Sequence, residues 1–169
     1  NFPLAIPCGM ATSALVAGNT VILKSAEQTP LIVQRFVELA YEAGIPEDVL
    51  IHAPGLGEEV GATLVTSPKV NSLVFTGSKA VGQWIYKEAS KRMATHPLLG
   101  VTFPTKVITE MGGKNAIIIT ANAELDETVA GVLYSAFAHS GQKCSACSRI
   151  IIDKKVKERF IERFKEAVK

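Results

Sequence analysis

Cysteine, histidine and tryptophan are scarce in this chain of 169 residues. It contains three cysteines, three histidines and one tryptophan. Three cysteines are an odd number and too few for a disulfide framework, so we expect a reducing, cytoplasmic compartment. A run of about 18 apolar residues is also absent, which excludes a membrane-spanning helix. No basic stretch followed by an apolar one opens the chain, so no signal peptide is visible.

An excess of either charge is missing too, because 18 Lys and Arg face 16 Asp and Glu. A net charge of +2 is too small to indicate a nucleic-acid partner. The densest basic run, residues 154–169, alternates with Glu and apolar residues, as a solvated helix face does. The length of 169 residues is enough for one domain and part of a second, and 47% hydrophobic residues are enough to bury a core. Because it opens at Asn1 rather than Met, we expect it to be the inside of something longer.

Predicted strands and helices alternate along the chain. Strands are predicted at residues 20–24, 49–53, 71–76, 106–110, 115–119 and 149–153. Helices are predicted at residues 10–17, 30–43, 58–66, 79–93, 125–138 and 155–168, with a loop at 94–104. This alternation predicts an α/β fold built from parallel βαβ units. The expected seam is the Gly112-Gly113 step.

Four polar or glycine-containing stretches follow predicted strands, where open parallel sheets bind their ligands. They are residues 24–27, 54–57, 75–78 and 110–113. In the first, Lys24 and Glu27 could each hold a ribose hydroxyl, and an acidic group there favours NAD over NADP. The alternative is a pair of exposed loop charges.

Gly55, Gly57 and Gly61 form a second cluster, between a strand and a helix. The spacing is one residue longer than the dinucleotide fingerprint GxGxxG. The helix start could still bind a pyrophosphate, although an ordinary tight turn explains the glycines as well. Glu58 and Glu59 complement the same helix dipole.

Cys144 and Cys147 lie in a CxxC segment, for which three interpretations compete. Zinc needs about four ligands, and no second CxxC exists to supply them. A thioredoxin-like pair opens a helix after the first strand of its fold, whereas this segment follows a long helix. The third interpretation is one nucleophilic cysteine with a structural neighbour, and Lys143 would favour its thiolate. Spacing does not decide which cysteine is the nucleophile.

Other titratable groups are less specific. Glu110 ends a strand before a glycine turn, so it is either a general base or a carboxylate that caps the turn. His52, His96 and His139 are isolated in the sequence, and satisfied or exposed side chains explain them better than ligands do.

Taken together, five motifs resemble the aldehyde dehydrogenase superfamily in order and spacing. They are residues 1–4, 24–27, 75–78, 110–114 and 141–144. The longer strings at 108–115 and 141–149 are most similar to the Δ1-pyrroline-5-carboxylate dehydrogenase group, which also occurs as the C-terminal half of bifunctional proline-utilisation proteins. The resemblance implies NAD-dependent oxidation of an aldehyde, here glutamate γ-semialdehyde, to the acid.

The same resemblance implies roles for individual residues. Cys144 would be the nucleophile, Glu110 the general base, and Asn1 the amide that shares an oxyanion hole with the Cys144 backbone N–H. Lys143 and Ser145 would flank the nucleophile and hold the substrate. The cofactor site would comprise Lys24, Glu27, Gly57, Gly61, Phe75, Thr76, Gly77, Ser78, Met111 and Gly112.

Further expectations concern the parent protein. Residues 1–111 would be part of an NAD-binding domain of Rossmann type, and residues 112–169 the start of the catalytic domain. The parent would be a homo-oligomer, whereas this piece alone would be inactive and would expose apolar surface. One departure from the family is Ser25, where proline is usual. The rival hypotheses are a dehydrogenase for another aldehyde and a non-catalytic nucleotide-binding module.

Overall fold

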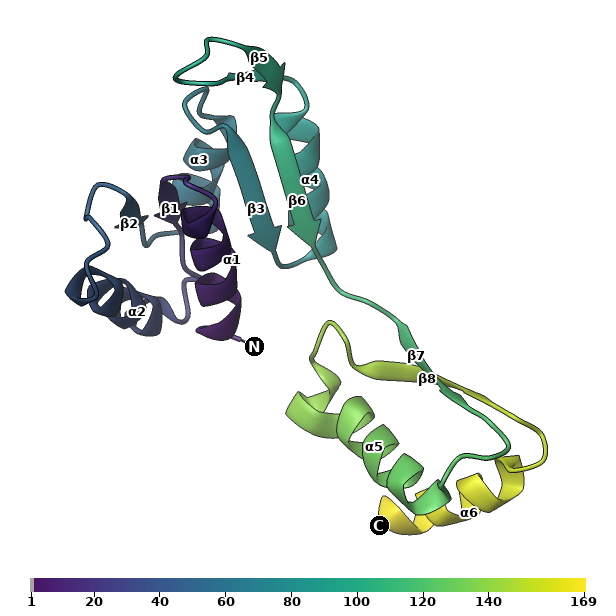
Figure 1. The fold of residues 1–169 in the computed structure, drawn as a ribbon. Coiled ribbons are helices and arrows are strands. Elements are labelled where there is room, and N and C mark those ends of the chain that lie inside the picture. Colours follow the sequence, from purple (N-terminus) through teal and green to yellow (C-terminus); the bar gives the residue numbers. More distant parts are fainter. Residues whose placement is uncertain (1) are drawn as a thin grey trace. The chain divides into compact units, whose positions relative to one another are not determined.

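The computed structural model describes residues 2–169, and these residues form two compact units. One runs from Phe2 to Glu110 and the other from Met111 to Lys169. Figure 1 shows the succession of helices and strands along both units. Within each unit, strands that are hydrogen-bonded in parallel are connected through helices, which is the βαβ arrangement.

The Phe2–Glu110 unit opens with α1 (Ala5–Val16), β1 (Val21–Leu23), α2 (Pro30–Glu42) and β2 (Leu50–His52). Strands β1 and β2 pair in parallel, with Leu23 opposite His52. Their core joins α1 and α2 to the sheet through the buried side chains of Ala11, Val37 and Leu50. This packing holds the carboxyl ends of β1 and β2 side by side.

The unit continues with a π-helical turn η1 (Gly57–Gly61), α3 (Ala62–Thr66), β3 (Ser72–Thr76) and α4 (Lys79–Ala89). An antiparallel hairpin of β4 (Met93–Thr95) and β5 (Thr102–Pro104) leads into β6 (Lys106–Glu110). Strands β3 and β6 lie in parallel, so that Thr76 is opposite Glu110 at their carboxyl ends. Helix α4 runs alongside this pair (Figure 1).

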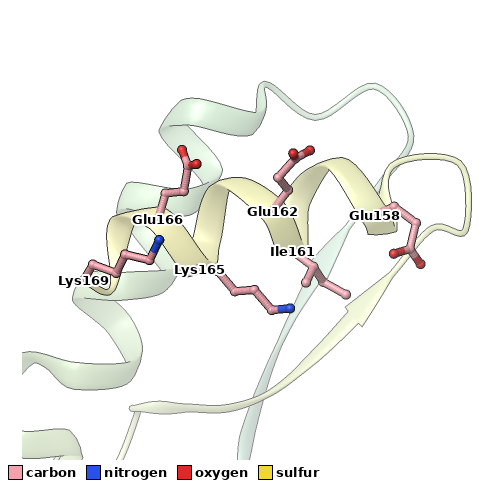
Figure 2. Close-up of a pocket in the computed structure, with 6 residues that line it drawn as sticks. All are labelled: Glu158, Ile161, Glu162, Lys165, Glu166 and Lys169. Carbon is pink, nitrogen blue, oxygen red and sulfur yellow. The ribbon is translucent and has the colours of Figure 1, made fainter.

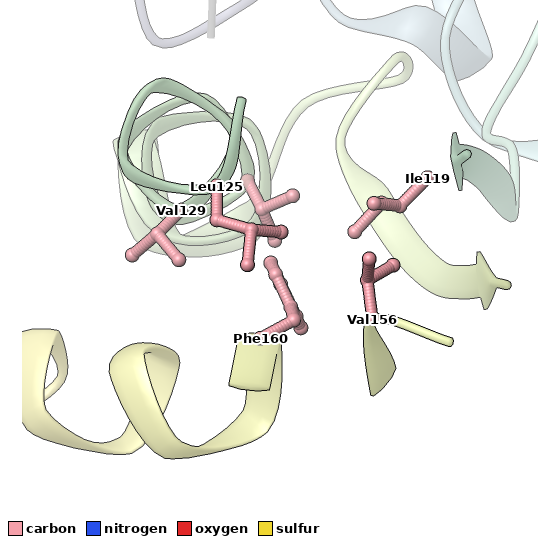
Figure 3. Close-up of a cluster of buried hydrophobic side chains, with 6 residues drawn as sticks. Ile119, Leu125, Val129, Val156 and Phe160 are labelled. Atoms are coloured by element: carbon pink, nitrogen blue, oxygen red, sulfur yellow. The ribbon is translucent and has the colours of Figure 1, made fainter. Parts of the chain in front are cut away.

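The Met111–Lys169 unit consists of β7 (Asn115–Ile119), α5 (Leu125–Phe137), a short η2 (Ala138–Gly141), β8 (Cys147–Ile152) and α6 (Lys157–Ala167). Strand β7 pairs in parallel with β8, with a register shift between Asn115 and Ala116. Figure 3 shows the core, where side chains from β7, α5 and α6 point toward one another. Its buried members are Ile119, Leu125, Val129, Val132, Val156 and Phe160.

The α/β class with parallel strands is confirmed, but three local predictions were wrong. Residues 94–104 are not a plain loop, because the hairpin β4–β5 occupies most of them, closed by the His96 N–H donating to the Val101 carbonyl at 2.8 Å. The preceding helix ends at Ala89 rather than near Met93, which already belongs to β4. Helix α1 begins at Ala5, since Pro7 lies in the first turn, where no intrahelical bond to its nitrogen is lost.

Several large apolar side chains remain exposed, as expected. On β7 and β8, Ile118 is 71% and Ile151 59% exposed. Among residues 2–169, no helix combines the length and the apolar character needed to cross a bilayer.

Candidate active site

Lys24 and Glu27 lie together in the loop after β1. The Lys24 ammonium donates to the Glu27 carboxylate at 3.2 Å and to the Ser25 backbone carbonyl at 2.6 Å. The glycines of the turn after β2 reach the same place: a Cβ on Gly57 would lie 3.3 Å from Glu27 Oε1, and one on Gly61 would lie 3.6 Å from Lys24 Cδ. The structure therefore brings together four residues predicted from two separate motifs.

The charge on Glu27 is favoured at this position. Its own backbone N–H, the Lys24 ammonium and the Gly57 N–H lower the pKa of the Glu27 carboxyl. The side chain is 36% exposed, so it stays accessible to a ligand while ionised. A donor and an acceptor held side by side match two adjacent hydroxyls of a ribose.

Phe75, Thr76, Gly77 and Ser78 continue β3 into α4. The Gly77 N–H donates to the Glu110 carbonyl at 3.1 Å, which joins this turn to the end of β6. Ser78 caps α4, because its hydroxyl oxygen accepts from the Val81 N–H at 3.3 Å. The Phe75 ring lies over the turn, and a Cβ on Gly77 would come within 2.5 Å of Phe75 Cζ. Any residue with a Cβ at position 77 would require the Phe75 ring to move.

Cys144 lies on an exposed loop in the second unit, just before β8. Its backbone carbonyl accepts a hydrogen bond of 2.6 Å from the side-chain amide of Asn115, the first residue of β7. Gly113 lies beneath the same carbonyl, where a Cβ would be only 2.9 Å from the oxygen. The loop that carries the thiol is therefore held against the segment that follows Glu110.

The two cysteines of the CxxC segment have different surroundings. Cys147 is 8% exposed and its thiol faces the Arg149 carbonyl at 3.2 Å, whereas Cys144 is exposed. Both are free thiols. Among residues 2–169, no three His, Cys, Asp or Glu side chains gather closely enough to hold a metal ion. An accessible thiol beside a buried one fits the hypothesis of a single nucleophile.

A strained turn precedes the cysteine loop. His139 and Ser140 have φ values of 55° and 57°, and Gly141 follows at 70°. Left-handed backbone costs non-glycine residues roughly 1–2 kcal/mol each. Such conformations persist only where surrounding contacts enforce them, and they concentrate at functional sites.

The other predicted residues flank these groups in the sequence or lie outside the described part. Lys143 is half-buried and Ser145 exposed, on either side of Cys144. Met111 is half-buried and Gly112 exposed, directly after Glu110, whose side chain is itself exposed. Asn1 lies outside the described residues, so its predicted oxyanion role stays a prediction.

Sequence reasoning assigned no role to Asn115 or Gly113. A signal was available for Asn115, the polar first residue of an otherwise apolar strand. His52 is satisfied by hydrogen bonds, as predicted, but its partners Ser25 and Gln34 were not predicted, because they come from two other segments.

None of the predicted site residues lines the shallow hollow along α6 that Figure 2 shows. It is lined by one face of a single helix, with Glu158, Ile161, Glu162, Lys165, Glu166 and Lys169. The alternation of acidic and basic groups marks a solvated helix surface.

Comparison with known proteins agrees with this geometry. The model of the aldehyde dehydrogenase family matches residues 1–169, and the chain therefore belongs to that family. It is 46% identical over 169 residues to the 1-pyrroline-5-carboxylate dehydrogenase of Bacillus cytotoxicus, covering 100% of this chain and 32% of the relative. It is 45% identical over 163 residues to the Bacillus subtilis protein of that name, covering 96% of this chain and 31% of the relative. The chain thus spans about a third of these relatives.

Solved structures show the same likeness. The 1-pyrroline-5-carboxylate dehydrogenase from Thermus with bound NAD aligns with a TM-score of 0.86 and 40% identity, over 98% of this chain and 31% of that one. Proline utilization A from Bdellovibrio bacteriovorus aligns with a TM-score of 0.84 and 48% identity, over 97% of this chain and 17% of that one. An NADP dependent enzyme from E. coli aligns with a TM-score of 0.85 and 35% identity, over 98% of this chain and 32% of that one. The Rossmann-like assignment of the fold is confirmed, whereas cofactor choice differs among these neighbours.

Proposed function

We propose that this chain is the cofactor-binding and nucleophile-bearing part of an NAD-dependent aldehyde dehydrogenase. The preferred substrate is glutamate γ-semialdehyde, the open form of Δ1-pyrroline-5-carboxylate, and the product is glutamate. The observation that carries the proposal is the exposed Cys144, held by Asn115 in a chain of this family. The relatives named 1-pyrroline-5-carboxylate dehydrogenase support the choice of substrate.

The Phe2–Glu110 unit has the donor set that a dinucleotide needs. Lys24 offers a cationic donor and Glu27 a carboxylate acceptor to the two hydroxyls of the adenine ribose. Gly57 and Gly61 keep the space beside them free of side chains. The Glu27 charge would repel a 2′-phosphate, which favours NAD over NADP. The turn from Phe75 to Ser78 would also contact the cofactor, and Met111 and Gly112 stay predicted cofactor residues.

The chemistry proposed for the second unit begins at Cys144. Its thiolate attacks the aldehyde carbon, and the carbonyl oxygen becomes the oxyanion of a thiohemiacetal. The Cys144 backbone N–H and the Asn1 amide would donate to that oxyanion. Bound NAD would supply the hydride acceptor, and loss of the hydride from the thiohemiacetal carbon would leave a thioester on Cys144.

Hydrolysis of the thioester completes the reaction. Glu110 would take a proton from water, whose oxygen attacks the thioester carbonyl and releases the acid and the Cys144 thiol. Lys143 and Ser145 flank the nucleophile and would hold the carboxylate of the substrate.

The test is NADH formation by the full-length parent with glutamate γ-semialdehyde, succinate semialdehyde and propionaldehyde. We expect the highest kcat/KM with the first, and a loss of at least roughly 1000-fold on Cys144→Ala. Turnover of the others but not the first would retain the family chemistry and reject the substrate. NAD binding without turnover of any aldehyde would favour a non-catalytic nucleotide-binding module.

A further inference from the structure

His52 connects three segments of the first unit at the carboxyl end of β2. One ring nitrogen, Nε2, lies 3.0 Å from the Ser25 hydroxyl, and the other, Nδ1, lies 2.8 Å from Gln34 Oε1 on α2. The residue is opposite Leu23 in the parallel pair, immediately beside the start of the Lys24–Glu27 loop. Ser25, in the middle of this arrangement, is only 2% exposed.

The direction of these hydrogen bonds follows from the contact that Gln34 makes with Glu38. Gln34 Nε2 donates to the Glu38 carboxylate at 3.2 Å, which leaves Gln34 Oε1, an acceptor, facing His52. His52 Nδ1 must then carry the proton, so the neutral ring presents Nε2 as an acceptor to the Ser25 hydroxyl. Burial lowers the pKa of His52 and so favours this neutral ring.

Ser25 transmits this arrangement to the cofactor site. Its backbone carbonyl accepts from the Lys24 ammonium at 2.6 Å, while its hydroxyl is held by His52. The same ammonium contacts Glu27. One buried serine therefore links the orientation of Lys24 and Glu27 to β2 and α2.

We propose that the chain of hydrogen bonds from Gln34 through His52 to Ser25 positions Lys24 and Glu27 for the ribose of the dinucleotide. This inference rests on the proposed function. His52 and Ser25 are positioning residues, since they act through Lys24 and Glu27 and do not touch the reacting atoms. Serine at position 25 lacks the rigid ring of a proline, and the hydrogen bond to His52 constrains the loop in its place.

The test uses the full-length parent and measures the Kd for NAD by titration, together with KM for NAD and kcat. Ser25→Ala and His52→Leu should each raise Kd and KM about 3- to 10-fold, the effect of one buried neutral hydrogen bond, with kcat unchanged at saturating NAD. The double variant should be no worse than His52→Leu alone, because Ser25→Ala removes only the Ser25–His52 hydrogen bond, which His52→Leu has already removed.

Two further variants separate positioning from a general loss of stability. His52→Gln keeps an acceptor that can reach the Ser25 hydroxyl, so its Kd should stay within about 2-fold of the wild type. Ser90→Ala removes an exposed hydroxyl that donates to the Lys87 carbonyl, and should leave all three constants unchanged.

The outcomes are distinct. Unchanged Kd in Ser25→Ala and His52→Leu, or additive losses in the double variant, would overturn the positioning role and leave the proposed function intact. Equal losses in His52→Gln and His52→Leu would also overturn it, because an acceptor at position 52 would then be irrelevant. A wild-type parent that binds no NAD would overturn both proposals.

Discussion

The side-chain amide of Asn115 donates to the backbone carbonyl of Cys144 at 2.6 Å, across 29 residues of sequence. The same amide lies 3.5 Å from the Ala146 carbonyl, so it contacts the cysteine loop at two places. It comes from the first residue of β7, next to the register shift in the β7–β8 pair. The position of the exposed thiol therefore depends on a side chain that does not belong to its own loop.

Removing that amide should slow the proposed reaction without affecting cofactor binding. In the full-length parent, we expect Asn115→Ala to lower kcat about 10-fold, the effect of losing one strong hydrogen bond that aligns the nucleophile. KM for NAD should stay constant. Asn122→Ala is the matched control, because the exposed Asn122 amide oxygen accepts from the Thr120 hydroxyl in its own turn. Equal rates for the Asn115 variant and the wild type would rule out this role.

Differential alkylation should distinguish the two cysteines. With iodoacetamide under native conditions, we expect Cys144 to be modified first, because it is exposed, and Cys147 to be protected at 8% exposure. Peptide mass spectrometry of the parent over time would show the order. Cys147→Ala should retain thiol-dependent turnover, whereas Cys144→Ala should not. Faster labelling of Cys147, or a pair linked as a disulfide before reduction, would instead support the dithiol hypothesis.

Glu27 should control the preference between NAD and NADP. Glu27→Gln removes the charge that would repel a 2′-phosphate, so we expect KM for NADP to fall by about 10-fold or more relative to KM for NAD. Steady-state kinetics of the parent with each cofactor would measure the ratio. Glu162→Gln, on the exposed face of α6, changes the net charge equally and should leave the ratio unaltered. If both variants shift the ratio alike, overall charge is responsible and Glu27 is not.

An added methyl group on Gly77 should disturb its contact with Phe75. A Cβ on Gly77 would lie 2.5 Å from Phe75 Cζ, so Gly77→Ala must displace the ring. We expect KM for NAD to rise at least about 5-fold, as overpacking distorts the proposed site. Gly9→Ala, which would meet nothing within 4 Å, is the control.

A second substitution makes this test sharper. Phe75→Leu removes the ring atoms that collide with the new methyl group, so the double variant should recover part of the lost affinity. A double variant weaker than Gly77→Ala alone would mean that the ring itself contributes to cofactor binding.

Much of this architecture could be predicted from local patterns. Alternating apolar strands and amphipathic helices predicted parallel βαβ units, because hydrophobic periodicity is a property of each segment alone. Which strands pair, β1 with β2, β3 with β6 and β7 with β8, was not predicted. The hairpin at β4–β5 escaped prediction because its strands, Met93–Thr95 and Thr102–Pro104, lack the β-branched apolar run that marks the equally short β1. The motif order also pointed to the aldehyde dehydrogenase family, which the family comparison confirmed.

By itself, the sequence determined the fold class, the family and the polar motifs at the strand ends. Only the tertiary structure decided which motifs meet. It placed Gly57 and Gly61 against Glu27 and Lys24, and distinguished the exposed Cys144 from the buried Cys147. The reason is that burial and hydrogen bonding depend on residues distant in sequence, and a local pattern carries no information about which distant residue will pack against it.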